Sequence, residues 1–260
     1  PSFVTVEGAK LRKAATATVA LPDLPMPVLP AIDGTHNVVI TGVGGTGVVT
    51  VGAVLAMAAH IDGMGAGMME MAGLAQKGGA VHIHLRLAAR PEDISAIRVA
   101  VGEADCVIGG DLVVTAGSKT LGLMRQGRTG AVVNSHEIVT GEFTRNRDFR
   151  LPSERLKLGL EARLGERVAF FDASELTRLA LGDSIYSNIA VLGAAWQQGL
   201  LPLSLEAIAR AIVLNGAGPE ANQRAFDLGR WAVVFPEQAA RLADPAPLTE
   251  PDPIEARAAH

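Results

Sequence analysis

The sequence predicts an α/β fold, with a Rossmann-like, mostly parallel sheet and helices on both of its faces. Residues 38–41 form a β-branched apolar run that leads into a glycine cluster and then into an uncharged helical pattern, as in a strand, loop and helix unit. Further apolar runs alternate with helical patterns as far as residue 230, which is typical of parallel strands joined by crossover helices. A hydrophobic content of 48% with 19% charged residues is that of a globular protein.

The 260 residues are enough for one domain with a proper core, and proline-rich segments flank that domain at both ends. We expect a linker or strap over residues 1–36, a single domain over residues 37–235, and a linker or tail over residues 236–260. Pro1 is not a natural first residue, and no tripartite secretory signal follows it. The sequence therefore looks like a piece of a longer chain.

Charge and cysteine content exclude several classes of function. A net charge of −4 offers no broad basic surface for nucleic acid. The sequence has a single cysteine, Cys106, which rules out an internal disulfide and a cysteine-held iron–sulfur or zinc site within it. It also favours a reducing compartment, so we expect a cytoplasmic protein. Residues 38–59 are long enough for a membrane span, but their glycines bunch at one point, so we expect no membrane association.

The first strand and the first helix are joined by Gly42, Gly44 and Gly47, which fit the pattern G-x-G-x-x-G. In such a loop the three glycines permit a tight turn, close approach of the backbone to a ligand, and close packing of the helix on the strand. The motif alone is a weak signal, because many folds use it.

A second strand is expected at residues 66–69. In a nicotinamide dehydrogenase, an acidic residue at the end of this strand would bind the ribose, and both Asp62 and Glu70 compete for that position. Asp62 lies in a turn-like segment and Glu70 is followed by another specialised loop, so neither fits well. That loop, residues 73–79, has paired glycines beside a lysine and a glutamine. It is either an anion contact or an ordinary turn with a solvated lysine.

Residues 81–87 alternate between apolar side chains and His82, His84 and Arg86. The alternation predicts a half-buried strand with one polar, partly basic face. Two histidines on one face occur in some metal sites, but no third ligand is evident, and zinc needs three or four. We therefore expect a structural or interface role for the two histidines.

The remaining segments continue the alternation of strands and helices. Strands are expected at residues 105–109, 131–134 and 168–171. Helices are expected at residues 118–125, 156–164, 188–198, 204–214 and 222–230. Asp172 or Ser174 is a candidate N-cap for a helix after the last strand.

Three groups of residues have the types used in catalysis but not the required pattern. Ser135, His136 and Glu137 are sequence neighbours, which do not point at one another in a triad, and no G-x-S-x-G elbow is present. Gly110-Asp111, followed later by Asn134, is faintly similar to the magnesium signature of thiamine-diphosphate enzymes, but Leu112 stands where a second glycine belongs. Cys106 lies in an apolar run, where an inert buried thiol is expected. We predict no catalytic residue and no metal ligand in this chain.

The order of the motifs resembles that of a known family. VVITGVGGTGVV is followed by GLAQKGGAVHIHLR, by ADCVIGGDL, by Asn188 in NIAVLGA and by Asn222 in NQRAF. The order resembles the gamma segment of 2-oxoacid:ferredoxin oxidoreductases of the pyruvate/ketoisovalerate type, and it is most similar to the large fused indolepyruvate:ferredoxin oxidoreductases. The similarity covers about residues 36–235. The start, PSFVTVEGAKLRK, is similar to the linker that follows the cysteine-rich iron–sulfur segment in fused members.

The resemblance implies an activity for the whole enzyme. That enzyme decarboxylates an arylpyruvate-type 2-oxoacid on thiamine diphosphate, passes electrons through iron–sulfur clusters to ferredoxin, and transfers the acyl group to coenzyme A. Thiamine diphosphate, magnesium and the clusters would lie on other segments. The gamma segment would complete the assembly and bind coenzyme A, and it would be inactive alone. Its implied partners are other domains or subunits of the same enzyme and ferredoxin, and the assembly would be dimeric.

The expected coenzyme A site combines the glycine loop, the second loop and two asparagines. Its residues are Gly42, Gly44, Gly45, Thr46, Gly47, Gln76, Lys77, Gly78, Gly79, Asn188 and Asn222. A glycine loop at a helix N-terminus suits a pyrophosphate, and Lys77 would add a point charge. Asn188 and Asn222 match family positions, but they are equally well explained as helix caps or packing amides.

The sequence is also compatible with two other functions. A purely structural Rossmann-like interaction module would have its glycine site filled by protein. An NAD(P)-dependent dehydrogenase would use the G-x-G-x-x-G loop together with an acid for the ribose.

Overall fold

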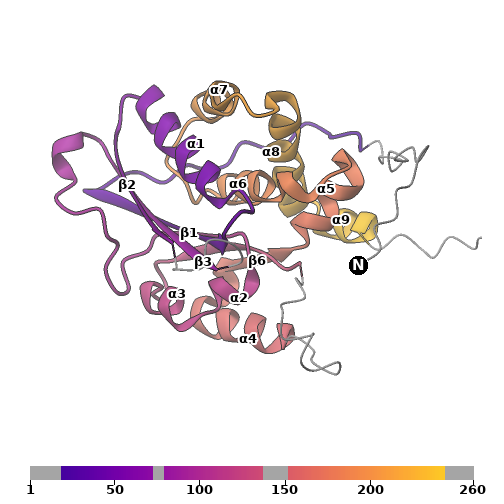
Figure 1. Cartoon of the computed structure of the whole chain (residues 1–260), viewed down its shortest axis with the longest axis horizontal. Helices are drawn as coiled ribbons and strands as arrows, with labels where there is room; N and C mark the ends of the chain where they lie inside the picture. The colour runs from indigo at the N-terminus through magenta and orange to yellow at the C-terminus, as the bar shows by residue number, and fades with distance from the viewer. Residues whose placement is uncertain (1–18, 73–78, 137–151, 244–260) are drawn as a thin grey trace, which may run out of the picture.

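The protein is described here from a computed structural model that covers residues 19–72, 79–136 and 152–243. It contains a six-stranded sheet with helices on both faces (Figure 1). The strands are β1 (Thr35–Val43), β2 (Gly65–Ala72), β3 (Ala80–Ala88), β4 (Cys106–Gly109), β5 (Gly130–Asn134) and β6 (Val168–Phe171). Their order across the sheet is β2-β3-β1-β4-β5-β6. The predicted fold class is confirmed.

The pairing of the strands makes the sheet mixed. β1, β4, β5 and β6 pair in parallel, whereas β3 is antiparallel to both β1 and β2. β3 alone therefore runs against the other five described strands. The side chains that alternate along β3 follow the predicted pattern: the apolar ones are buried and His82 and Arg86 are half-buried, but His84 is only 1% exposed.

Helices form a layer on each face of the sheet (Figure 1). On one face α1 (Val48–Ile61) and α6 (Ser187–Gln197) pack on the strands, and α7 (Leu205–Asn215) and α8 (Pro219–Val234) pack on these helices. The other face carries α2 (Leu112–Thr115), α3 (Ser118–Leu123) and α4 (Ser153–Leu164). α5 (Ala173–Leu181) and α9 (Pro236–Ala243) lie beside α8.

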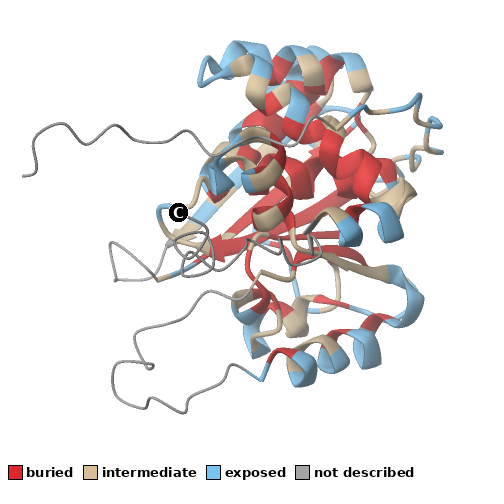
Figure 2. Cartoon of the chain, turned by 90° about the vertical axis from the view of Figure 1, so that its right-hand side faces the viewer, coloured by how far each residue is buried: buried red, intermediate tan, exposed pale blue. Residues whose placement is uncertain are grey.

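β1 shows why the two layers hold together. Successive side chains of a strand point to opposite faces, and in β1 Val38 and Ile40 join the core under α1 and α6, while Val39 joins the core under α2 and α4. All three are almost completely buried, and most of the sheet is coloured as buried in Figure 2. A continuous apolar run is therefore the pattern that this central strand requires.

Helices α6 and α8 approach each other unusually closely. A Cβ on Gly193 of α6 would lie 2.0 Å from the carbonyl oxygen of Phe226, and a Cβ on Gly229 of α8 would lie 1.7 Å from that of Ala190. Only glycine fits at such a crossing, because any side chain would meet the backbone of the other helix. The contact fixes the position of both helices.

The segments at the two ends of the described chain meet beside α8. Leu21 and Leu24 of the N-terminal segment pack against a cluster that includes Trp231 of α8 and Ala239 of α9. Residues 19–34 are irregular, as their prolines predict. Residues 236–243, at the start of the predicted linker or tail, form α9, while the predicted domain boundaries themselves remain a prediction.

Candidate functional site

The glycine loop lies where the chain turns to opposite faces of the sheet. After β1 the chain enters α1 on one face, and after the neighbouring strand β4 it enters α2 on the other. The N–H of Gly110, just after β4, donates to the carbonyl of Thr41 at 2.7 Å and ties the two strand ends together. In open α/β sheets, ligands bind at such a switch point, outside the carboxyl ends of the strands.

The loop glycines have different tasks from those that the motif suggests. Gly42, expected at the tight turn, instead permits close packing, because a Cβ there would lie 2.3 Å from Cγ2 of Val48. Gly45 and Gly47 have φ values of +90° and +88°, which L side chains rarely adopt. Around a Cβ on Gly45 there is nothing within 4 Å. The backbone at Gly45 is therefore open to a ligand.

The N-terminus of α1 has no side-chain cap. Its N-cap is Gly47, and its first turn contains no acidic residue. The first N–H groups of a helix have no partner within the helix, and the helix dipole makes this end favourable for an anion. Thr46, expected to offer a hydroxyl, donates that hydroxyl to the carbonyl of Val43 at 2.7 Å. The backbone, rather than Thr46, provides the donors.

A cleft of about 340 Å³ opens at this helix end, and we call it the α1 cleft. It is formed by the glycine loop, the start of α6 and the turn before α8. The residues that line it are Gly45, Gly47, Thr50, Ile185, Tyr186, Asn188, Ile189, Ala217, Gly218 and Asn222. Four residues of the predicted site, from three segments of the chain, thus share one cleft.

Both asparagines of the α1 cleft hold the backbone of its walls. The side-chain N–H of Asn188 donates to the carbonyl of Thr46, and that of Asn222 donates to the carbonyl of Ala217. A Cβ on Gly110 would lie 2.3 Å from Oδ1 of Asn188, so this glycine leaves room for the amide. The two amides shape the cleft, as the packing interpretation expects, and they line it as well.

The second predicted loop meets the first at one residue. Gln76, Lys77 and Gly78 lie outside the described residues. The carbonyl of Gly79 accepts the N–H of Gly44 at 2.8 Å. The end of the second loop therefore touches the glycine loop, as a second wall of the site requires.

The two candidate ribose acids are not where a dehydrogenase needs them. Asp62 follows α1, and its carboxylate accepts the N–H and the hydroxyl of Ser204 at 2.8 and 2.7 Å, at the start of α7. Glu70 is exposed on β2, and β3 separates β2 from β1. In the dinucleotide-binding fold, the strand that carries this acid lies beside β1.

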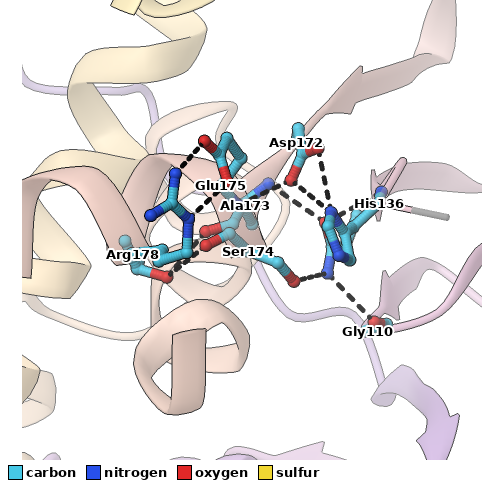
Figure 3. A network of polar contacts seen from close by, with 9 residues as sticks. Gly110, His136, Asp172, Ala173, Ser174, Glu175 and Arg178 are labelled. Carbon is cyan, nitrogen blue, oxygen red and sulfur yellow. Dashed lines mark hydrogen bonds and ion pairs between the residues drawn. The ribbon is translucent and has the colours of Figure 1, made fainter. Parts of the chain in front are cut away.

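A polar network at the ends of β5 and β6 was not predicted (Figure 3). Nδ1 of His136 donates to the carboxylate of Asp172, 3.0 Å away, and Asp172 also caps α5 by accepting the N–H of Glu175. The side chain of Asn134 donates to the hydroxyl of Ser174 at 2.9 Å and accepts the N–H of Ala173 at 3.0 Å. The network joins two strand ends, and its members are far apart in sequence. The cap at Asp172 is the part that the sequence predicted.

Asp111 and Cys106, which were considered for catalysis, have structural roles. Asp111 caps α2 by accepting the N–H of Val114 at 2.8 Å, and burial raises the pKa of its carboxyl. Cys106 is completely buried, which raises the pKa of its thiol. In the described part of the chain, no group of three or more His, Cys, Asp or Glu residues could hold a metal ion.

Comparison with known proteins identifies the family. The sequence profile described as "Pyruvate ferredoxin/flavodoxin oxidoreductase" matches residues 37–232. This chain belongs to that family. The match begins in β1 and ends in α8, so it includes the glycine loop and both asparagines of the α1 cleft.

Relatives of this oxidoreductase chain are subunits of enzymes that act on oxoacids. It is 29% identical over 199 residues to "Indolepyruvate oxidoreductase subunit IorB" of Pyrococcus horikoshii, which covers 75% of this chain and 94% of the relative. Its fold matches that of the gamma subunit of a keto/oxoacid ferredoxin oxidoreductase from Geobacter sulfurreducens, with a TM-score of 0.53, 20% identity, and 76% and 98% of the two chains covered. The 2-oxoglutarate:ferredoxin oxidoreductase of Magnetococcus marinus, solved with 2-oxoglutarate, coenzyme A and succinyl-CoA bound, matches with a TM-score of 0.50 and 16% identity over 84% of this chain and 32% of that chain.

No described helix of this oxidoreductase chain combines the length and the apolar character that crossing a bilayer requires.

Proposed function

We propose that this chain is the gamma-type part of an indolepyruvate-type 2-oxoacid:ferredoxin oxidoreductase, and that it binds coenzyme A in the α1 cleft. In this proposal it completes an assembly that oxidatively decarboxylates arylpyruvates to acyl-CoA. Thiamine diphosphate, magnesium and the iron–sulfur clusters belong to other segments, which also pass the electrons to ferredoxin. The fragment alone is inactive, and the assembly is dimeric and cytoplasmic.

The uncapped N-terminus of α1 at the α1 cleft carries the proposal. Gly45 and Gly47 present backbone there with nothing above Gly45, and the helix end offers N–H groups and a favourable dipole. These features fit the pyrophosphate of coenzyme A. The cleft of about 340 Å³ has room for part of such a ligand rather than for all of it. The family relatives add support, because one related assembly has coenzyme A bound.

The α1 cleft also separates this proposal from the two alternatives. A purely structural module predicts a glycine site filled by protein, whereas the described residues leave the α1 cleft open. A dehydrogenase needs an acid beside β1, and Asp62 instead binds the start of α7. Coenzyme A needs neither a filled site nor a ribose acid at that position.

A matched pair of glycine variants tests the proposal in the assembled enzyme. Gly45 and Gly63 both have positive φ, and neither would have an atom within 4 Å of an added Cβ. Replacement by alanine therefore costs both a similar amount of backbone strain, about 1–2 kcal/mol, but only Gly45 lines the α1 cleft. We expect Gly45→Ala to weaken coenzyme A binding about tenfold by calorimetry, and Gly63→Ala to leave it unchanged. Equal affinities for the two variants would refute binding at this loop.

Lys77→Ala distinguishes binding from scaffolding in the same enzyme. An increased KM for coenzyme A with the assembly intact supports a contact between the second loop and the coenzyme. Loss of the assembly, measured by size-exclusion chromatography, supports the structural module instead.

A further inference from the structure

A second pocket lies on the face of the sheet opposite to the α1 cleft. It has a volume of about 560 Å³, within the range of small-molecule sites. It lies against β3 and α3, and we call it the β3 pocket. His82 and His84 line it from β3, Lys119 from α3, and Arg98 from the segment before β4. None of these residues belongs to the proposed coenzyme A site.

His84 presents a hydrogen-bond donor without a partner. The N–H of Val99 donates to Nδ1 of His84 at 2.9 Å, so the neutral ring carries its hydrogen on Nε2. His84 is 1% exposed, and its Nε2 has no hydrogen-bond partner. Burial, and then electrostatic interactions with His82, Arg98 and Arg86, lower the pKa of His84 to about 4. The ring is therefore neutral at pH 7, and its buried N–H is an unmet donor, which native proteins rarely leave.

His82 is held in place by a neighbouring hydroxyl. The hydroxyl of Thr120 donates to the carbonyl of Val114 at 3.0 Å, so Nε2 of His82, 3.2 Å from that hydroxyl oxygen, must be the donor to it. Burial, and then the charge of Lys119, lower the pKa of His82. Lys119 and Arg98 are exposed. Two exposed cations and two largely neutral imidazoles thus line the same pocket.

The walls of the β3 pocket are mixed. Met71 and Leu123 add apolar surface, and no acidic residue is among the described residues that line it. Cations in a described lining that includes no carboxylate favour an anion, while the apolar walls favour a hydrophobic group. A small inorganic ion would leave those walls unused.

We propose that the β3 pocket binds a small organic carboxylate with an apolar body. Lys119 and Arg98 pair with the carboxylate, the body lies against Met71 and Leu123, and an acceptor atom of the ligand takes the N–H of His84. Nε2 of His84 is shielded from water in the present conformation, so binding includes the rotation of a side chain that covers it.

Phenylacetate is a suitable probe for the full 260-residue chain, with phenylacetamide as its neutral counterpart. We expect saturable binding of phenylacetate by calorimetry in the millimolar range, and binding of phenylacetamide weaker by about tenfold. In nuclear magnetic resonance spectra of the histidine side chains, the 15N chemical shift of Nε2 of His84 should change when phenylacetate is added. Absence of saturation, equal affinity for the two probes, or tighter binding of inorganic phosphate than of phenylacetate would overturn the proposal.

Exposed cations provide the variants, because they can be changed without disturbing the core. We expect the double variant Lys119→Gln/Arg98→Gln to weaken phenylacetate binding about tenfold. Arg210→Gln removes an exposed cation from α7, on the other face of the sheet, and should leave binding unchanged. Equal losses in the two variants would indicate a general effect of charge and refute the site.

Gly45→Ala separates this site from the proposed coenzyme A site. We expect that variant to bind phenylacetate as the wild type does, even if it no longer binds coenzyme A. If Gly45→Ala abolished phenylacetate binding, the probe would occupy the α1 cleft and the β3 pocket would not be the site.

Discussion

Gly229 is the residue at which a single added carbon should most clearly damage the fold. In Gly229→Ala, the new Cβ would lie 1.7 Å from the carbonyl oxygen of Ala190, about half of an ordinary contact distance. The obstacle is backbone, so no side chain can rotate away and α8 must move from α6. Overpacking of this kind costs about 1–3 kcal/mol, occasionally more. Part of this cost is offset, because alanine has a helix propensity about 1 kcal/mol more favourable than that of glycine. Because the clash is severe, we expect a net loss of about 2 kcal/mol.

Gly159→Ala is the matched control. Gly159 also lies inside a helix, α4, but it is exposed and a Cβ there would have nothing within 4 Å. We expect this variant to gain about 0.5–1 kcal/mol of stability. Urea and thermal unfolding followed by circular dichroism measure both effects, with about 2–4 °C of Tm for each kcal/mol. If Gly229→Ala were as stable as Gly159→Ala, the close approach of α6 and α8 would not be a constraint and the reasoning would be refuted.

Two further predictions concern buried titratable groups. The pKa of His84 is about 4 in the folded chain against 6.5 for the free side chain, so the unfolded chain binds this proton first as pH falls. The stability that comes from keeping this ring neutral is complete above about pH 6.5 and is lost as the pH falls towards 4. In His84→Gln, the free energy of unfolding in urea should therefore decrease less between pH 6.5 and pH 4 than in the wild type. The thiol of Cys106 is fully buried, with its pKa raised by burial. Ellman's reagent should therefore label it only after denaturation, and rapid labelling of the native chain would contradict its position in the core.

Much of the fold was predictable because the central strands are buried on both faces. Residues 38–41, 131–134 and 168–171 are short apolar runs, and each lies in a strand of the sheet. The direction of β3 was not predictable, since alternation reports which face a residue occupies and not which neighbour its strand pairs with. α9 begins with Pro236, and a proline at the first position does not prevent a helix from forming. The prolines of this segment therefore led to the prediction of a linker where a helix is present.

The site was predictable where a motif fixes backbone and less so where tertiary structure assembles it. The spacing of glycines located the loop, but it did not say which glycine has positive φ, so the tasks of Gly42 and Gly47 differed from those predicted. His136 and Asp172 meet because β5 pairs with β6, and they are 36 residues apart. A polar residue directly after each of two strands was the available signal, because the ends of parallel strands share one edge of a sheet.

The α1 cleft is built from parts that are fixed relative to one another. Asn188 is the second residue of α6 and Asn222 lies in the first turn of α8, and the glycine contact between these helices sets the distance between the two amides. Each amide in turn holds a loop carbonyl, at Thr46 or at Ala217. The described lining of the cleft has no charged side chain, so its own residues provide shape, backbone donors and a helix dipole. A polyanionic coenzyme also needs cations, which must then come from Lys77 or from a partner domain. If a partner domain provides them, the proposed coenzyme A site reaches full affinity only within the assembled enzyme.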